Sequence, residues 1–535
     1  GLWRQDSTII VSQGARVIRG RSAPGRCGGL TSPGPGRFIW TYPQAKDPTM
    51  AIPVEAFYLT PGTPGSLQQQ IRSMVTQGIL AGRFRPGQRM PSSRGLAGHL
   101  GVSRITVTLA YADLVSSDYL TAAGRSGYFV SETAPLAPEF PESAPRAEAV
   151  DFRALTGGRF SQGARVIRPE DWDRYAYPFI YGQADPTLFD HQNWRQCALR
   201  ALGKRDFAAL TSDYYERDDP LLVQELLRTI LPRRGIAARE DEVLLTLGAQ
   251  NALWIAATLL LGPRRRAVVE NPGYPAWRAI VAATGAEAVP VDVDEGGLPP
   301  DRVSGDVVFT TPSHQCPTNA TMPVERRTAL LDAAERQGFV IVEDDYEFEM
   351  SFLKPVAPAL KSLDRDGRVI YAGSFSKSVF PGLRLGYLVG PPGFIAEARA
   401  LRGLMLKHPP GHIQRTMAYF LGLGHYDALV NRMKHAYRRR RQVLAEAIAA
   451  EGLEVAGQGG FGGSSFWMRA PEGVDTEALA LRLRSEGVLI EPGRAFFAPE
   501  PWQDRGPGNY YRLAYSSIAL PKIAEGIARI GRALR

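Results

Sequence analysis

The run Gly373-Ser-Phe-Ser-Lys377 follows a short apolar stretch, Val369 to Ala372, and continues into Pro381-Gly-Leu-Arg-Leu-Gly-Tyr387. Similar apolar stretches recur upstream with helical patterns between them, at Val243 to Leu247, Ala267 to Glu270, Ala288 to Val293, Val307 to Thr310 and Phe339 to Glu343. Continuous apolar strands that alternate with helices indicate a mostly parallel sheet covered on both faces. We therefore predict an α/β domain whose ligand lies beyond the carboxyl ends of its strands.

Polar residues directly follow five of these predicted strands, at Gly248 to Gln250, Asn271 to Tyr274, Ser313 to His314, Asp344 to Tyr346 and Ser374 to Lys377. Pyridoxal phosphate needs an amine for its Schiff base, a carboxylate beside its pyridine nitrogen, a hydroxyl at its phenolate oxygen and anion ligands at its phosphate. The five segments contain all of these groups. The sequence therefore predicts a pyridoxal 5'-phosphate site and no metal site.

Three residues can meet the needs of the cofactor's ring. Lys377 can supply the amine, Asp344 the carboxylate and Tyr346 the hydroxyl. A helix that begins at Gly248 and Ala249 offers free backbone N–H groups to the phosphate. The remaining expected contacts are a ring stacked on the cofactor and further phosphate ligands, from Tyr274, Ser374, Ser376 and Arg384.

Positive charge is concentrated at the N-terminal end of the chain. The 535 residues carry a net charge of +9; residues 1–50 hold seven Lys and Arg against two Asp, and residues 51–131 hold seven Arg against three acids. The other residues are neutral overall. This asymmetry suits a polyanion-binding module attached to a neutral sensor or enzyme, or alternatively a solvated basic face.

The segment after residue 65 predicts three helices and a hairpin. Ser66, Ser92 and Ser103 can each cap a helix that carries apolar residues at helical spacing, and Gly101 makes the turn between the second and third helices. Two short strands follow, at Tyr119 to Thr121 and Tyr128 to Val130. This is the spacing of a helix-turn-helix with a wing.

Residues 60–131 resemble the winged-helix domain of the GntR superfamily. The matching runs are Pro91-Ser-Ser-Arg94, Leu100-Gly-Val-Ser-Arg104 and Gly127-Tyr-Phe-Val130, while Asp118 stands where the family usually has glycine. The resemblance implies that the partner is double-stranded operator DNA and that the helix after Ser103 enters the major groove. The DNA-binding residues that it implies are Arg94, Ser103, Arg104, Thr106 and, in the wing, Arg125.

From about residue 170 to the C-terminus, the chain resembles fold-type I aminotransferases, and specifically the aminotransferase-like half of MocR regulators. The matching runs are TLGAQNAL, ENPGYP, TPSHQCPT, VEDDYE, GSFSKS and YRLAYS. The resemblance implies a small C-terminal α+β subdomain. It assigns the Schiff base to Lys377, the pyridinium partner to Asp344, the phenolate contact to Tyr346 and a phosphate contact to Arg384.

The same resemblance extends to the effector and to a second subunit. It places Arg512 where the family holds the acidic group of an amino-acid ligand, a role that suits a bidentate guanidinium; the alternative is a structural ion pair. It also implies a head-to-tail homodimer in which Tyr214 or Tyr215 reaches the partner's site. Effectors of MocR regulators include metabolites linked to γ-aminobutyrate, vitamin B6, taurine or ectoine, and the sequence leaves the choice open.

A stretch rich in proline, alanine and glutamate separates the two resemblances. We expect a disordered or non-native extension over residues 1–52, the winged helix over 53–131, a linker over 132–150 and the cofactor-binding domain over 151–535. The longest apolar run, Ala252 to Leu261, is far shorter than the roughly 20 residues that span a bilayer. Three widely spaced cysteines and no signal-peptide pattern indicate a cytoplasmic protein without a membrane partner.

One position departs from the aminotransferase pattern. Those enzymes have an Asn-Pro-Thr-Gly-like run whose asparagine donates to the cofactor's phenolate oxygen, and here Cys316 takes its place. His314 or Gln315 could substitute. MocR regulators also lack the asparagine, so its loss is consistent with a site that binds an amine without turning it over efficiently.

We therefore predict a DNA-binding transcription regulator in which an amino-compound effector displaces Lys377, forms an external aldimine with pyridoxal phosphate and alters operator binding. The alternative is a catalytically active aminotransferase with an autoregulatory DNA-binding domain. A repressor with an empty cofactor site is a third possibility.

Overall fold

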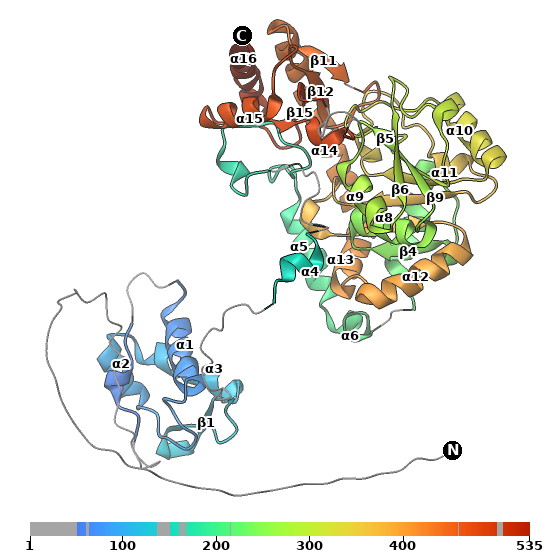
Figure 1. Cartoon of the computed structure of the whole chain (residues 1–535). Coiled ribbons are helices and arrows are strands. Elements are labelled where there is room, and N and C mark those ends of the chain that lie inside the picture. Colours follow the sequence, from blue (N-terminus) through green and yellow to red (C-terminus); the bar gives the residue numbers. More distant parts are fainter. Residues whose placement is uncertain are drawn as a thin grey trace, which may run out of the picture. The chain divides into compact units, whose positions relative to one another are not determined.

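The computed structural model describes residues 51–59, 64–135, 150–158, 160, 166, 168–213, 216–457, 459–499 and 507–535. The chain divides into two compact units, of which the smaller ends at Ala149 and the larger begins at Val150 (Figure 1). Most of the expected N-terminal extension and of the expected linker lies outside the described residues, so these domain boundaries stay predictions.

The smaller unit is a winged helix-turn-helix. Its elements are α1 (Leu67–Leu80), α2 (Ser93–Leu100), α3 (Arg104–Ser116), β1 (Leu120–Ala122) and β2 (Tyr128–Val130). Each helix begins where a serine hydroxyl accepts a hydrogen bond from a backbone N–H two or three positions inside it, as at Ser103, whose Oγ lies 3.1 Å from Thr106 N. Gly101 ends α2 with a φ of +65°, a conformation that glycine adopts without strain. The helices and the hairpin confirm the predicted fold of this unit.

A seven-stranded sheet forms the centre of the larger unit, in the order β4-β10-β9-β8-β7-β5-β6. Six of its strands are those that the sequence predicts: β4 (Val243–Thr246), β5 (Arg266–Asn271), β6 (Glu287–Asp292), β7 (Val307–Thr310), β8 (Val340–Asp345) and β9 (Val369–Ser374). The seventh, β10 (Gly386–Val389), was not predicted and runs antiparallel to both of its neighbours. The other neighbouring pairs are parallel. This confirms a mostly parallel sheet.

Helices cover both faces of the sheet. Successive residues of β4 alternate between two apolar clusters: Leu244 packs in a cluster with residues of α8, α9 and α12, whereas Val243 and Leu245 pack in a cluster with residues of α13 and α14. The helices of this part are α5 (His191–Ala201), α6 (Phe207–Thr211), α7 (Pro220–Glu225), α8 (Gly248–Leu260), α9 (Pro275–Ala283), α10 (Val324–Gln337), α11 (Leu360–Leu363), α12 (Pro392–Leu406), α13 (Gly411–Gly422) and α14 (His425–Ala450).

The C-terminal residues form a small α+β subdomain, which is orange and red in Figure 1. Its antiparallel sheet has the order β11-β12-β15-β14 and packs with the end of α14 and two further helices. The elements are β11 (Glu454–Gly457), β12 (Ser465–Arg469), β14 (Glu491–Pro492), β15 (Tyr510–Ala514), α15 (Thr476–Ser485) and α16 (Ile523–Leu534). Near the start of the larger unit lie α4 (Phe152–Thr156) and β3 (Tyr177–Pro178), which pairs with β13 (Val488–Leu489).

The described residues contain neither a membrane-spanning helix nor a metal-binding cluster. No helix there is long and apolar enough to cross a membrane. No group of three or more His, Cys, Asp or Glu side chains in the same ranges is arranged to hold a metal ion.

Candidate functional site

A cavity of about 630 Å³ lies in the larger unit, at the carboxyl ends of β8 and β9. Its walls contain almost every residue that the sequence predicts for the cofactor and the effector, namely Ala249, Tyr274, Asp344, Tyr346, Ser374, Ser376, Lys377, Arg384 and Arg512. Gly248 is the exception, and it lies directly behind the wall: a Cβ on Gly248 would stand 3.0 Å from Nη2 of Arg384. The structure therefore brings residues from widely separated parts of the sequence to one place.

Lys377 follows β9 and is half-buried, with its Nζ atom 4.3 Å from the centroid of the Tyr181 ring. Burial, together with the positive charges of Arg168 and Arg512, lowers the pKa of Lys377 to about 8. The next residue along from Tyr181 is Gly182, which has a φ of +76°, and a Cβ there would lie 2.1 Å from Nζ. A side chain at position 182 would be strained by this φ and would displace the Lys377 amine from its present place. The amine is easily deprotonated and so suited to Schiff-base formation.

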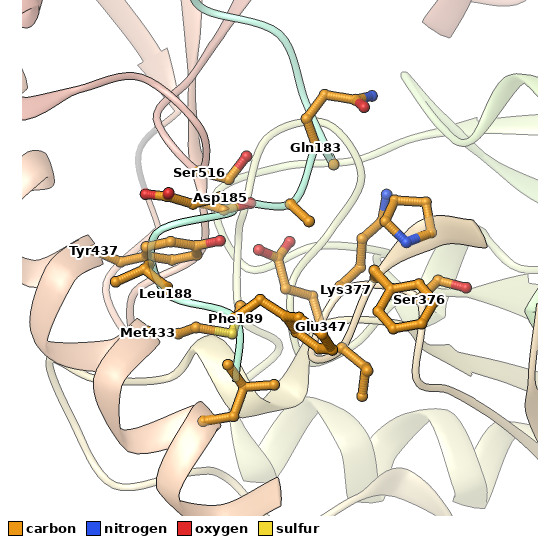
Figure 2. A pocket seen from close by; sticks show the side chains of 17 residues that line it. Gln183, Asp185, Leu188, Phe189, Glu347, Ser376, Lys377, Met433, Tyr437 and Ser516 are labelled. Carbon is orange, nitrogen blue, oxygen red and sulfur yellow. The ribbon is translucent and has the colours of Figure 1, made fainter. Parts of the chain in front are cut away.

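A second cavity, of about 20 Å³, also has Lys377 and Ser376 in its wall (Figure 2). Glu347 lies in the same wall and accepts a hydrogen bond of 2.6 Å from the Tyr181 hydroxyl. Burial raises the pKa of Glu347, while its charge opposes the fall in the pKa of Lys377. Lys377 thus lines two cavities, and in the smaller one it is accompanied by the carboxyl group of Glu347.

Asp344 is the better candidate of the two adjacent aspartates for holding a cationic ring nitrogen. Asp345 is engaged by Arg234 Nε at 2.6 Å and by the Tyr371 hydroxyl at 2.8 Å. Buried Oδ1 atoms of both aspartates have no hydrogen-bond partner among the described residues, but only Asp344 lines the cavity, where a ligand could supply one. Burial, then the charges of Asp345 and Glu270, raises the pKa of Asp344 to about 8. A pyridinium N–H fits this site, since it would satisfy the oxygen and stabilise the carboxylate.

The beginning of α8 has the features of an anion site. Its N-cap residue, Leu247, provides no side-chain cap, so the first backbone N–H groups of the helix are free to bind an anion. The Ser376 hydroxyl is buried without a hydrogen-bond partner among the described residues. Arg384 Nη2 lies 3.3 Å from the carbonyl oxygen of Leu247, which brings a guanidinium to the helix start. These groups fit a phosphate.

The region around Cys316 departs from the sequence-based expectation. Gln315 donates its amide to Glu270 at 3.0 Å, His314 Nε2 pairs with Ser351 Oγ at 3.1 Å, and neither side chain lines the cavity. The structure therefore gives no support to either residue as a substitute for the missing asparagine. Cys316 itself lines the cavity, and burial raises the pKa of its thiol to about 12, so the group is neutral. The Tyr346 hydroxyl donates to the backbone oxygen of His314 at 2.9 Å.

Arg512 is part of a three-residue charge cluster, Arg168–Glu491–Arg512. Arg512 Nη2 lies 2.7 Å from Glu491 Oε2, so the ion pair that the sequence left as an alternative is present. Arg168 Nε lies 2.6 Å from the other oxygen of Glu491 and also lines the cavity. Burial alone would raise the pKa of Glu491, but the charges of Arg512 and Arg168 outweigh it and lower that pKa. Two guanidinium groups and one carboxylate give the cluster a net charge of one positive unit.

The side chains predicted to contact DNA differ in their exposure and in the hydrogen bonds that they already make. Arg94 on α2 and Arg104 on α3 are exposed. The hydroxyls of Ser103 and Thr106 lie 2.8 Å apart, and Ser103 Oγ also caps α3, so both groups are occupied within the helix. Arg125 lies in the wing, and its side chain is outside the described residues.

The fold and the site together define a class: a winged helix-turn-helix joined to a fold-type I aminotransferase-like domain. Residues 193–516 match the family of class I and II aminotransferases, and residues 67–130 match the gntR family of bacterial regulatory proteins. The chain is 64% identical to the HTH-type transcriptional regulator TauR of Rhodobacter capsulatus, over 91% of this chain and 100% of that protein. It is 29% identical to the probable rhizopine catabolism regulatory protein MocR of Rhizobium meliloti, over 86% of this chain and 92% of that protein.

Solved structures of aminotransferases share the fold of the larger unit. The α-aminoadipate aminotransferase LysN of Thermus thermophilus, complexed with N-(5'-phosphopyridoxyl)-L-leucine, has a TM-score of 0.63 and 27% identity over 71% of this chain and 97% of that chain. The kynurenine aminotransferase of Pyrococcus horikoshii, in complex with PMP, has a TM-score of 0.62 and 25% identity over 72% of this chain and 96% of that chain. The chain therefore belongs to the MocR family of pyridoxal-phosphate-dependent transcription regulators.

Proposed function

We propose that this regulator responds to a primary amine that carries an acidic group and binds in the Lys377 cavity. The observation that carries the proposal is that Lys377 lines the same cavity as the two arginines of the Arg168–Glu491–Arg512 cluster. One end of such a ligand would meet the amine-exchanging group and the other end would meet positive charge.

The chemistry at the amine end follows from the residues around Lys377. Pyridoxal phosphate, when bound, supplies an aldehyde carbon that exchanges between primary amines. The lowered pKa of Lys377 favours the neutral amine that such an exchange requires. In this proposal Asp344 holds the ring nitrogen, while Ser374, Ser376, Arg384 and the N–H groups at Gly248 and Ala249 hold the phosphate. Tyr274 and Tyr346 contact the ring.

The acidic end is proposed to bind at the charge cluster. Arg512 is 4% exposed, and its guanidinium lies 4.0 Å from the centroid of the Tyr181 ring, so its position is fixed by packing as well as by charge. A carboxylate or sulfonate can accept two parallel hydrogen bonds from a guanidinium. Because Glu491 neutralises only one of the two arginines, the ligand's anion would balance the remaining charge.

Arg168 suggests how ligand binding could reach the DNA-binding unit. It lies in the segment that leads from the predicted linker into the larger unit, 18 residues after Val150. A ligand that engages the Arg168 guanidinium would restrain this segment. The ligand shifts operator affinity only if it binds one arrangement of the chain more tightly than another.

The proposed assembly is a cytoplasmic, head-to-tail homodimer whose two winged helices contact two half-sites of operator DNA. Several large apolar side chains of the larger unit are exposed, among them Leu202 (55% exposed), Phe207 (63%) and Leu404 (89%). Burial of such side chains against a second copy of the chain would support the dimer. Tyr214 and Tyr215 lie outside the described residues, so their donation to the partner's site stays a prediction. Sedimentation at several protein concentrations tests the assembly, and a monomer that binds cofactor fully would contradict it.

A working aminotransferase is the second candidate. It is favoured by the presence of Lys377, Asp344 and Tyr346 in one cavity, and the neutral thiol at Cys316 argues against it. The two functions are separated by incubating the cofactor-loaded protein with amines that carry a carboxylate or sulfonate, together with a keto acid. A change in cofactor absorbance without product supports the regulator, whereas steady product formation at ordinary enzyme rates supports the enzyme.

A further inference from the structure

The outward face of α3 carries two apolar side chains. A helix that reads base edges in a groove usually presents hydrogen-bonding groups there. Val107 and Tyr111 point into the core of the smaller unit, which leaves Ile105 and Leu109 outward. Ile105 is 71% exposed and Leu109 is 48% exposed. Residues four apart on a helix are neighbours on its surface, so these two side chains form one patch.

The polar groups beside this patch are already engaged. The Thr108 hydroxyl donates to the backbone oxygen of Arg104 at 2.9 Å, and the Ser103 and Thr106 hydroxyls bond to each other. The exposed charged side chain at this end of α3 is Arg104, whose Nε lies 3.4 Å from Ser93 Oγ. Each of these hydroxyls already makes a hydrogen bond within the helix and keeps only part of its bonding capacity, so the feature that sets these two turns apart is the exposed apolar pair Ile105 and Leu109.

The charge around the Ile105 and Leu109 patch indicates that the molecule which covers it is a nucleic acid. Arg104, which is exposed, directly precedes Ile105, its Nε lies 3.4 Å from the hydroxyl of Ser93, the neighbour of exposed Arg94, and residues 51–131 carry seven arginines against three acids. A second protein surface that covered the patch would also have to neutralise these charges, whereas the phosphates beside a DNA groove do so directly. In the major groove, the apolar group that distinguishes one base from the others is the C5-methyl group of thymine.

We propose that Ile105 and Leu109 contact thymine methyl groups and so determine part of the operator sequence. This inference rests on the DNA-binding half of the function given above. Four residues of α-helix rise about 6 Å, and successive base pairs are about 3.4 Å apart. The two thymines therefore lie within about two base-pair steps of each other in each half-site.

The test uses the full chain and DNA that differs by single methyl groups. The cofactor-loaded protein selects its preferred duplexes from a randomised pool, and each thymine of the selected duplex is then replaced in turn by deoxyuridine. We expect two neighbouring replacements per half-site to weaken binding by about fourfold each, the effect of one buried carbon group. Ile105→Ala should abolish the effect at one of these positions and Leu109→Ala at the other.

Leu67→Ala is the matched control, because Leu67 is 45% exposed but lies at the start of α1. It should distinguish thymine from deoxyuridine as the wild-type protein does. Equal binding of thymine and deoxyuridine duplexes by the wild-type protein would overturn the inference, as would an effect of Ile105→Ala on self-association with none on base preference. Failure to select any duplex would instead contradict DNA binding itself.

Discussion

Glu491 and Arg512 face each other across the antiparallel strands β14 and β15, and they form a buried ion pair whose arginine lines the Lys377 cavity. The same carboxylate accepts a hydrogen bond from Arg168, whose side chain is one-third exposed. The sequence separates Arg168 from Glu491 by 323 residues. The pair is therefore a structural contact, and in our proposal its arginine also binds the effector; variants of the two residues should separate these roles.

The first prediction concerns Arg512→Ala. The cofactor absorbance should persist, while the effector concentration for half-maximal response should rise by about 10- to 100-fold, the range for losing a charged hydrogen bond. Titration of cofactor absorbance with amino acids and ω-amino acids, including γ-aminobutyrate and taurine, measures this. Glu491→Gln should instead lower the free energy of unfolding, because it leaves a buried guanidinium unpaired. An unchanged effector response in Arg512→Ala would show that Arg512 does not bind the acidic group of the effector.

The second prediction concerns Gly182, which packs against the Lys377 amine. Gly182→Ala places a Cβ within 2.1 Å of the lysine Nζ and imposes a φ of +76° on alanine, so the amine must move and cofactor absorbance should be lost. Gly393→Ala is the control, because a Cβ there meets nothing within 4 Å and its φ is ordinary. Spectra of the two variants after dialysis against pyridoxal phosphate make the comparison. Normal cofactor absorbance in Gly182→Ala would contradict the packing of Lys377.

The third prediction is a pH dependence of the cofactor-free protein. Burial holds the pKa of Asp344 at about 8, against an ordinary value of 3.8. Between these values the folded state holds a proton that the unfolded state releases, so stability falls as the pH rises from about 4 to about 8, by at most about 1.4 kcal/mol per pH unit. The melting temperature should therefore fall more steeply with pH in the wild-type protein than in Asp344→Asn. Parallel curves would show that Asp344 does not titrate in this range.

The fourth prediction concerns Arg104→Ala on α3. Loss of a phosphate or groove contact should weaken binding of the selected duplex by about tenfold and leave cofactor absorbance unchanged. Arg72→Ala, an exposed arginine on α1, is the matched control. Affinities measured at several salt concentrations should show a shallower salt dependence for Arg104→Ala alone. Wild-type affinity in Arg104→Ala would contradict the placement of α3 in the groove.

Local patterns were sufficient to predict most of the fold. The three serine caps and the six apolar strands depend on neighbouring residues, and parallel topology brings residues that follow the strands to one edge. Lys377, Asp344 and Tyr346 could be predicted as a set because they lie at the carboxyl ends of two predicted strands, Asp344 and Tyr346 at β8 and Lys377 after β9. Strand β10 could not, because it has only four residues, of which the first two belong to the run Pro381 to Tyr387, and no local pattern gives a strand's direction.

The charge cluster and the glycine beside Lys377 depend on tertiary contacts. Arg168 precedes the first predicted strand by more than 70 residues, and nothing in its neighbours indicates Glu491 as its partner. Gly182 follows no predicted strand, and its role appears only when the Lys377 side chain is in place. Ile105 and Leu109 were not among the residues predicted to contact DNA, because the sequence gives neither their exposed fractions nor the hydrogen bonds of the hydroxyls beside them.

The fifth prediction tests the central claim, that a ligand at Lys377 controls DNA binding. Wild-type protein and Lys377→Ala, both supplied with pyridoxal phosphate, are titrated with the amine that most alters wild-type cofactor absorbance, and affinity for the selected duplex is measured at each concentration. We expect wild-type affinity to change over the same amine concentrations as its absorbance, and Lys377→Ala to keep its basal affinity without responding. A Lys377→Ala protein that responded at wild-type concentrations would contradict the account.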